Sequence, residues 1–121
     1  MLILATNSDL IQVMTGSAGS IDVHASWMDN VAGAVGPGRT NTAITTAATT
    51  TVVPAPAGGT PPVQRNLKTL HVRNKGATPN DVSVIHTDGT TAVTLQKVTL
   101  LPEATLQYVD EVGFLPQLTG I

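Results

Sequence analysis

The feature that most constrains this chain is an alternation of apolar and polar residues with a period of two. It is clearest at Ile21, Val23, Ala25 and Trp27, which are separated by single polar residues. Successive side chains of a β-strand point to opposite faces, so this pattern predicts a strand with one buried face. No segment sustains the apolar period of 3.6 that marks an amphipathic helix. The chain is therefore predicted to be all-β.

Similar runs recur along the whole chain. The candidate strands are residues 2–6 (a strand or an extended arm), 10–14, 21–28, 43–53, 66–74, 82–86, 92–101, 105–110 and 113–115. Asp88-Gly89 lies between two of them and predicts a tight β-hairpin. About eight short strands with glycine and proline between them are typical of an antiparallel β-sandwich or barrel. At 121 residues, we expect one domain, residues 1–121.

Glycine and proline also mark the expected connections. Residues 15–20 contain two glycines and predict a hairpin turn, and residues 29–42 predict a loop. Residues 54–63 contain four prolines and two glycines, too many for a strand, and predict a linker loop. Residues 1–9 are expected to form an N-terminal arm or an edge strand.

Low charge is the most informative part of the composition. Charged residues make up 12% of the chain, about half the usual share for a globular domain, and the net charge is −2. The six basic residues are scattered, which argues against nucleic-acid binding. No apolar run approaches the ~20 residues of a membrane span, so no membrane association is expected. A surface of low charge is easily desolvated against another protein, which favours a subunit of a larger assembly.

No pattern predicts catalysis or a cofactor. Residues 33–40 (GAVGPGRT) resemble a phosphate-binding loop, but Arg39 replaces the required lysine and a poor helix sequence follows. His24, His71 and His86 lack the short spacing of metal ligands, and the chain has no cysteine. We therefore expect no enzyme, and no catalytic, cofactor or metal residues.

Several segments together carry a resemblance to a known family. They are residues 8–13 (SDLIQV), 21–28 (IDVHASWM), 37–40 (PGRT), 52–57 (VVPAPA), 64–66 (QRN), 86–89 (HTDG), 106–108 (LQY) and 113–114 (GF). With these segments the chain resembles short virion proteins of tailed bacteriophages, and in size and composition it is similar to capsid decoration (cement) proteins.

The resemblance implies a structural role in the virion, assembled in the host cytoplasm. The expected partners are the major capsid protein and other copies of this chain, with a trimer as the implied oligomer. In this reading the protein binds between major capsid subunits and stabilises the head. The residues expected at its interfaces are Leu2, Ile3 and Leu4, which could add a strand to a neighbour's sheet, and Arg39 and Arg65, which flank the loops.

Two alternatives remain open. A neck, tail or head-spike component would share the β domain and the oligomerisation. A host-surface carbohydrate-binding module would need exposed aromatic side chains for stacking on sugars, and the chain has only Trp27, Tyr108 and Phe114. Trp27 and Tyr108 are expected in the core.

Overall fold

The structure, a computed structural model, describes residues 1–117. It confirms that the chain is all-β, with ten strands in place of the eight or so expected. The strands are β1 (Leu2–Leu4), β2 (Leu10–Thr15), β3 (Ile21–Val31), β4 (Ala34–Ile44), β5 (Thr49–Val53), β6 (Gln64–Asn74), β7 (Asn80–Thr87), β8 (Ala92–Leu100), β9 (Thr105–Val109) and β10 (Gly113–Gln117). Within residues 1–117, no helix is long and apolar enough to cross a membrane.

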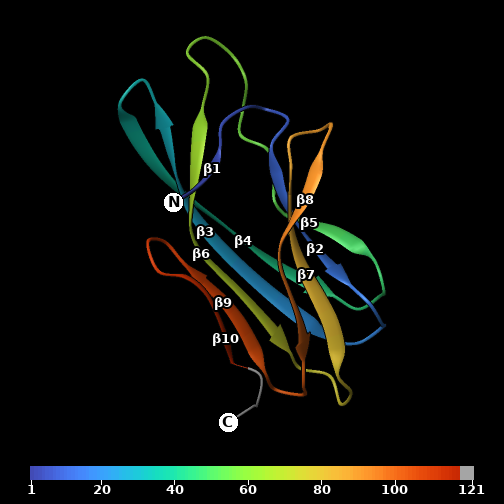
Figure 1. The fold of residues 1–121 in the computed structure, drawn as a ribbon. Coiled ribbons are helices and arrows are strands. Elements are labelled where there is room, and N and C mark those ends of the chain that lie inside the picture. Colours follow the sequence, from blue (N-terminus) through green and yellow to red (C-terminus); the bar gives the residue numbers. More distant parts are fainter. Residues whose placement is uncertain (118–121) are drawn as a thin grey trace.

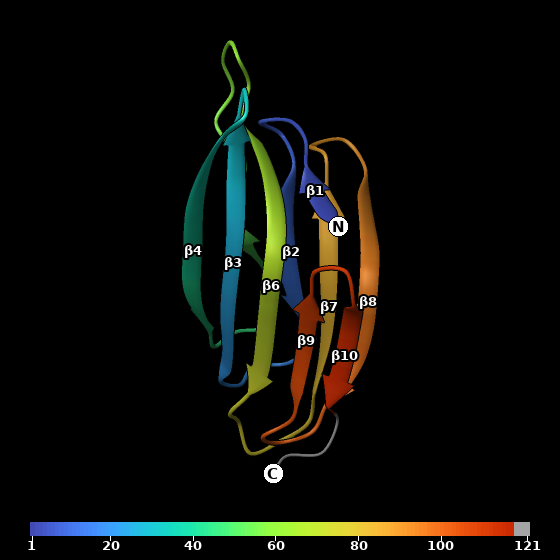
Figure 2. The same ribbon diagram turned by 90° about the vertical axis from the view of Figure 1, so that its left-hand side faces the viewer.

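The strands form two antiparallel sheets that pack face to face as a sandwich (Figures 1 and 2). The larger sheet has the order β10-β9-β6-β3-β4, and β1 pairs with the part of β6 that β9 leaves free. The smaller sheet has the order β5-β2-β7-β8. Each sheet ends in edge strands, so of the two architectures expected, the structure is a sandwich and not a closed barrel. Both sheets contain strands from both halves of the chain.

The core lies between the sheets and follows the period-two pattern. In β3, Ile21, Val23, Ala25 and Trp27 are buried, while the residues between them face outward. Leu67, Leu70 and Val72 of β6, together with Val82 and Val84 of β7, are buried in the same core. Fully burying a side chain of this size stabilises the fold by about 1.5–3 kcal/mol. Trp27 and Tyr108 are 7% and 6% exposed, which confirms their expected place in the core.

The prediction of a hairpin at residues 15–20 was wrong. This turn carries the chain from β2 in the smaller sheet to β3 in the larger one, and β2 pairs with β5 and β7. Polar side chains hold the crossing in place: the Thr15 hydroxyl donates to the Thr46 carbonyl over 2.8 Å, and Asn80 hydrogen-bonds both the Ser17 NH and its carbonyl. A glycine-rich turn alone does not distinguish a hairpin from a crossing between sheets.

The prediction of a loop at residues 29–42 was also wrong. β3 continues to Val31, and β4 begins at Ala34 and pairs with β3 in continuous register up to Ile44. Gly38 belongs to this strand and lies opposite Trp27. A glycine is needed at this position because a side chain would collide with the indole ring. Pro37 is tolerated because β4 is an edge strand of its sheet.

The expected strand at residues 43–53 is two strands in different sheets. Ala43 and Ile44 end β4 in the larger sheet, a turn follows, and Thr49–Val53 forms β5 at the edge of the smaller sheet. The Thr40 hydroxyl of β4 donates to the Val52 carbonyl of β5 over 2.5 Å and joins the two edges.

The later predictions hold. β6, β7, β8, β9 and β10 cover the expected runs, and β7 and β8 form the hairpin around Asp88-Gly89. The Asp88 carboxylate accepts the NH groups of Thr90 and Thr91, and Gly89 has a φ of 93°, as such a turn requires. Residues 54–63 contain no strand, as expected for the linker loop.

Candidate interaction surface

Two uncharged segments project side by side from one end of the sandwich (Figures 1 and 2). One is the tip of the β3–β4 hairpin, residues 30–38, and the other is the connection from β5 to β6, residues 54–63. Neither contains an Asp, Glu, Lys, Arg or His residue. Val35 on the first segment is 66% exposed. We call these two segments the uncharged end.

The hairpin tip is a tight turn of two residues. Ala32 and Gly33 form a two-residue turn with φ angles of 51° and 90°, and the Asn30 side chain accepts the Gly33 NH over 2.8 Å. Two positive φ values in a two-residue loop are typical of the type I′ turn, whose twist matches that of the flanking strands. The tip therefore extends the ladder of β3 and β4 beyond the core as a defined projection.

The loop of residues 54–63 is tied to the domain near both of its ends. The Val63 NH donates to the Ala57 carbonyl over 3.2 Å, and Pro56 is buried. The Pro54 carbonyl accepts a hydrogen bond of 2.6 Å from Nη1 of Arg65. The part of the loop between Ala57 and Val63 is exposed.

Charged groups pair with one another at the other end of the larger sheet, where β3 begins and β6 ends. The Lys75 ammonium lies 2.9 Å from the Asp22 carboxylate, and the Arg73 guanidinium pairs with Glu103. All four side chains are about half exposed. The two projecting segments, in contrast, contain no charged side chain.

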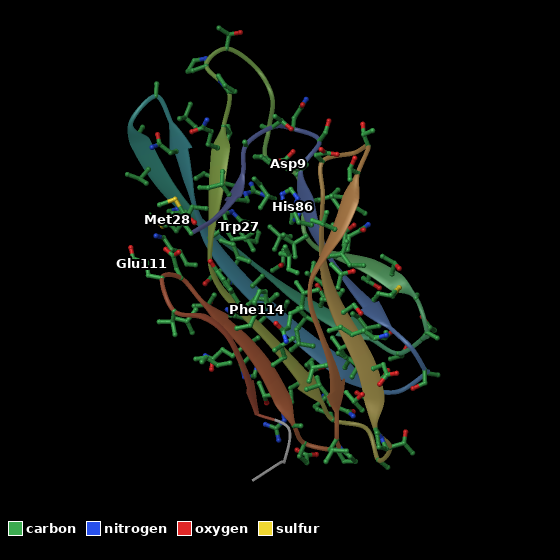
Figure 3. All side chains as sticks on the ribbon, viewed as in Figure 1. Asp9, Trp27, Met28, His86, Glu111 and Phe114 are labelled. Carbon is green, nitrogen blue, oxygen red and sulfur yellow. The ribbon has the colours of Figure 1, made fainter. Side chains whose placement is uncertain are left out.

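Arg65, expected at an interface, lies in the interior beneath the uncharged end. It is 9% exposed, and its guanidinium makes two hydrogen bonds to the Asp29 carboxylate, of 2.8 and 3.1 Å. The same guanidinium stacks over the Trp27 ring, 4.4 Å from the ring centroid. Trp27 is seen at the centre of the upper half of the molecule in Figure 3. The alternation of β6 turns Arg65 inward with Leu67, so its role in this structure is to join β3, β6 and the start of the loop.

The N-terminal residues expected at an interface form β1, which pairs with β6 of the same chain. Leu4 is fully buried, Leu2 packs against the core, and Ile3 faces outward and is 38% exposed. Arg39, in contrast, is exposed on the outer face of β4, next to the uncharged end. Of the five residues expected at interfaces, the structure therefore leaves Ile3 and Arg39 accessible to a partner.

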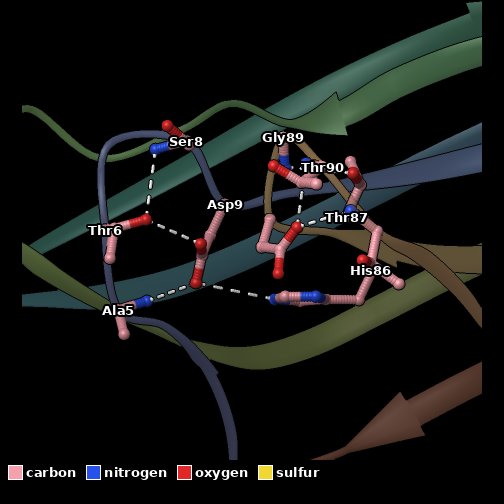
Figure 4. Close-up of polar contacts among 10 residues, drawn as sticks. Ala5, Thr6, Ser8, Asp9, His86, Thr87, Gly89 and Thr90 are labelled. Carbon is pink, nitrogen blue, oxygen red and sulfur yellow. Dashed lines mark hydrogen bonds and ion pairs between the residues drawn. The ribbon is translucent and has the colours of Figure 1, made fainter.

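Asp9 forms a polar cluster beside His86 (Figure 4). Its carboxylate accepts the Ala5 NH over 2.8 Å and the Thr6 hydroxyl over 2.7 Å, and it lies 3.8 Å from Nε2 of His86. Burial alone would raise the pKa of Asp9, but these hydrogen bonds and the nearby imidazole outweigh burial and hold the pKa below its ordinary value of 3.8. The cluster ties the β1–β2 turn to β7.

The three histidines do not gather at one site. His86 lies beside Asp9, whereas His24 and His71 are opposite each other on the outer face of the larger sheet. Among the residues that the structure describes, no three His, Asp or Glu side chains are placed to hold a metal ion together. The sequence pattern missed the approach of His24 to His71, because they are 47 positions apart and only the β3–β6 register joins them.

No protein-family model matches the chain, and neither a curated protein nor a solved structure was found to match it.

Proposed function

We propose that this protein is a non-enzymatic structural protein of a tailed-phage virion, a decoration protein that stabilises the head by binding between major capsid subunits. The observation that carries the proposal is the uncharged end, 19 residues in two adjacent projections at one end of the sandwich. The sequence resemblance is the ground for the virion role, and the uncharged end is the surface that we propose contacts the capsid.

The physical argument rests on desolvation. Contact with another protein removes water from both surfaces, and this costs free energy wherever a charge is left without a partner. The projecting segments carry no charge, and they offer exposed apolar groups such as Val35 and Pro37. Because both segments are tied to the core at their bases, they lose less conformational entropy on burial than free segments of the same length would.

The exposed Arg39 fits the same contact. It lies on the outer face of β4 next to Pro37, at the border between the uncharged end and the rest of the sheet. A polar rim around an apolar centre is the usual arrangement of a protein interface. We therefore place Arg39 at the rim of the capsid contact.

The aromatic side chains favour this proposal over a carbohydrate-binding module. Trp27 and Tyr108 are buried, and Phe114 packs on Tyr108 with the ring centroids 5.1 Å apart. Sugar binding by stacking uses aromatic faces that are open to solvent.

The copy number of the protein in purified virions, relative to the major capsid protein, tests the proposal. A ratio near one to one is the expected result. A ratio far below one would overturn decoration in favour of a neck, tail or head-spike position, and absence from particles would overturn the virion role altogether.

A pair of matched substitutions tests the contact surface. Val35→Glu places a charge in the uncharged end, and Val112→Glu places the same charge at an equally exposed valine (66% and 64%) on the β9–β10 turn. We expect Val35→Glu to lower the occupancy of the protein on particles and Val112→Glu to leave it unchanged. Equal occupancy of the two variants would remove the uncharged end as the contact.

A further inference from the structure

His24 and His71 form a cross-strand pair of histidines on the larger sheet. His24 of β3 and His71 of β6 are direct partners in the antiparallel ladder, and both point to the outer face of the larger sheet. Directly opposite residues of such a ladder have Cβ atoms about 4.5–5.5 Å apart. The two imidazoles line the same shallow hollow, together with Asp22 and Asn41.

Asn41 prepares one of the two rings. Its side-chain oxygen lies 2.6 Å from Nδ1 of His24. A carbonyl oxygen only accepts hydrogen bonds, so Nδ1 carries the proton and Nε2 of the neutral ring keeps its lone pair. Histidines that bind metal ions almost always donate their second ring NH to such an oxygen, which fixes the ring orientation and the tautomer. β4 thus provides the supporting hydrogen bond for a ligand on β3.

His71 of β6 provides the second ring. It is half-buried on the outer face of the sheet and lines the same hollow as His24. Charged side chains also lie two residues along each strand. Asp22 of β3 is paired with Lys75, and Arg73 of β6 is paired with Glu103.

We propose that His24 and His71 together bind a divalent transition-metal ion of the Zn²⁺, Ni²⁺ or Cu²⁺ class, each through one ring nitrogen. Imidazole nitrogen is a preferred ligand for these ions, and the chain has no cysteine to compete for them. Two protein ligands leave the remaining coordination positions to water, so the site is open and exchangeable, unlike a closed structural zinc site with four protein ligands. The site is independent of the proposed virion role.

The test is a titration of the full chain, without an affinity tag, with ZnCl₂ in a calorimeter. We expect one site per chain in the wild type. His24→Ala and His71→Ala should each weaken Zn²⁺ binding by about tenfold or more, and Asn41→Ala should weaken it by about tenfold, as for other residues that orient a ligand. His86→Ala is the matched control, and we expect it to bind Zn²⁺ as the wild type does.

A second measurement uses the wild-type protein alone, so it does not depend on the folding of any variant. Substoichiometric Ni²⁺ is paramagnetic and should broaden the ring proton signals of His24 and His71 before those of His86. Equal broadening of all three histidines, or loss of Zn²⁺ binding in His86→Ala but not in His24→Ala and His71→Ala, would overturn the proposal.

Discussion

Gly38 lies directly across the β3–β4 ladder from Trp27, and the indole ring occupies the space that a side chain at Gly38 would need. A Cβ atom at this position would lie 2.4 Å from Nε1 of Trp27 and 2.6 Å from Cε2. The indole is covered on another side by the guanidinium of Arg65. The β4 strand therefore packs where it does because residue 38 has no side chain.

The first prediction concerns Gly38→Ala. The new methyl group forces the indole or the β4 backbone to move, and overpacking of this kind costs about 1–3 kcal/mol. The free energy of unfolding, measured in urea, should fall by this amount, and the fluorescence of Trp27, the single tryptophan, should change in the folded state. Gly36→Ala is the control, because a Cβ there meets no atom within 4 Å. A similar loss of stability in both variants would contradict the packing argument.

The second prediction concerns Arg65→Ala. This change leaves the Asp29 carboxylate without its bidentate partner, exposes a face of Trp27 and frees the Pro54 carbonyl. Breaking an ion pair that is largely buried costs about 3 kcal/mol or more, whereas an exposed pair contributes less than about 1 kcal/mol. Denaturant unfolding should show this difference between Arg65→Ala and the control Arg73→Ala, whose pair with Glu103 is exposed. Equal effects of the two changes would show that Arg65 is not a structural residue.

The third prediction concerns the hairpin tip. Ala32 has a φ of 51°, a left-handed conformation that costs a residue with a Cβ about 1–2 kcal/mol. Asn tolerates this conformation and is favoured before Gly33 in such a turn, so Ala32→Asn should raise the midpoint of thermal unfolding and stabilise the fold by roughly 1 kcal/mol. Ala34→Asn, on the neighbouring strand, should bring no gain. If Ala32→Asn is neutral or destabilising, the turn is not the one described.

The fourth prediction concerns pH. The pKa of Asp9 is lower in the folded chain than its ordinary value of 3.8, which applies to the unfolded chain. Between these two pKa values the unfolded chain binds more protons than the folded chain. The free energy of unfolding therefore falls as the pH falls. The contribution of Asp9 is fully present well above pH 4 and is lost as the pH drops through the folded-state pKa. Asp9→Asn should therefore flatten the dependence of the unfolding free energy on pH below about 4.

A direct measurement checks the sign of this effect. The carbon-13 signal of the Asp9 carboxyl group, followed by NMR, should titrate with a midpoint below 3.8 in the folded protein. A midpoint above 3.8 would mean that burial outweighs the hydrogen bonds from Ala5 and Thr6, and the slope would then have the opposite sign.

Much of the secondary structure could be predicted from the sequence, because a half-buried strand needs a local alternation that is visible in any single segment. For this reason the sequence alone predicts β2, β3 and β6. The turn residues Asp88-Gly89 likewise predict the β7–β8 hairpin correctly. Glycine and proline were less reliable guides. Gly36, Pro37 and Gly38 predict a loop, but they lie in the edge strand β4, which pairs with β3 alone. Gly38 is needed there because the Trp27 indole occupies the space that a side chain would take.

The sequence by itself determined that this protein is all-β and that its surface carries little charge. Only the tertiary structure decided which strands share a sheet, that Arg65 points inward while Arg39 points outward, and that His24 lies opposite His71. The physical reason is that alternation is a property of neighbouring residues. Register, in contrast, is set by hydrogen bonds and packing between segments far apart in the chain.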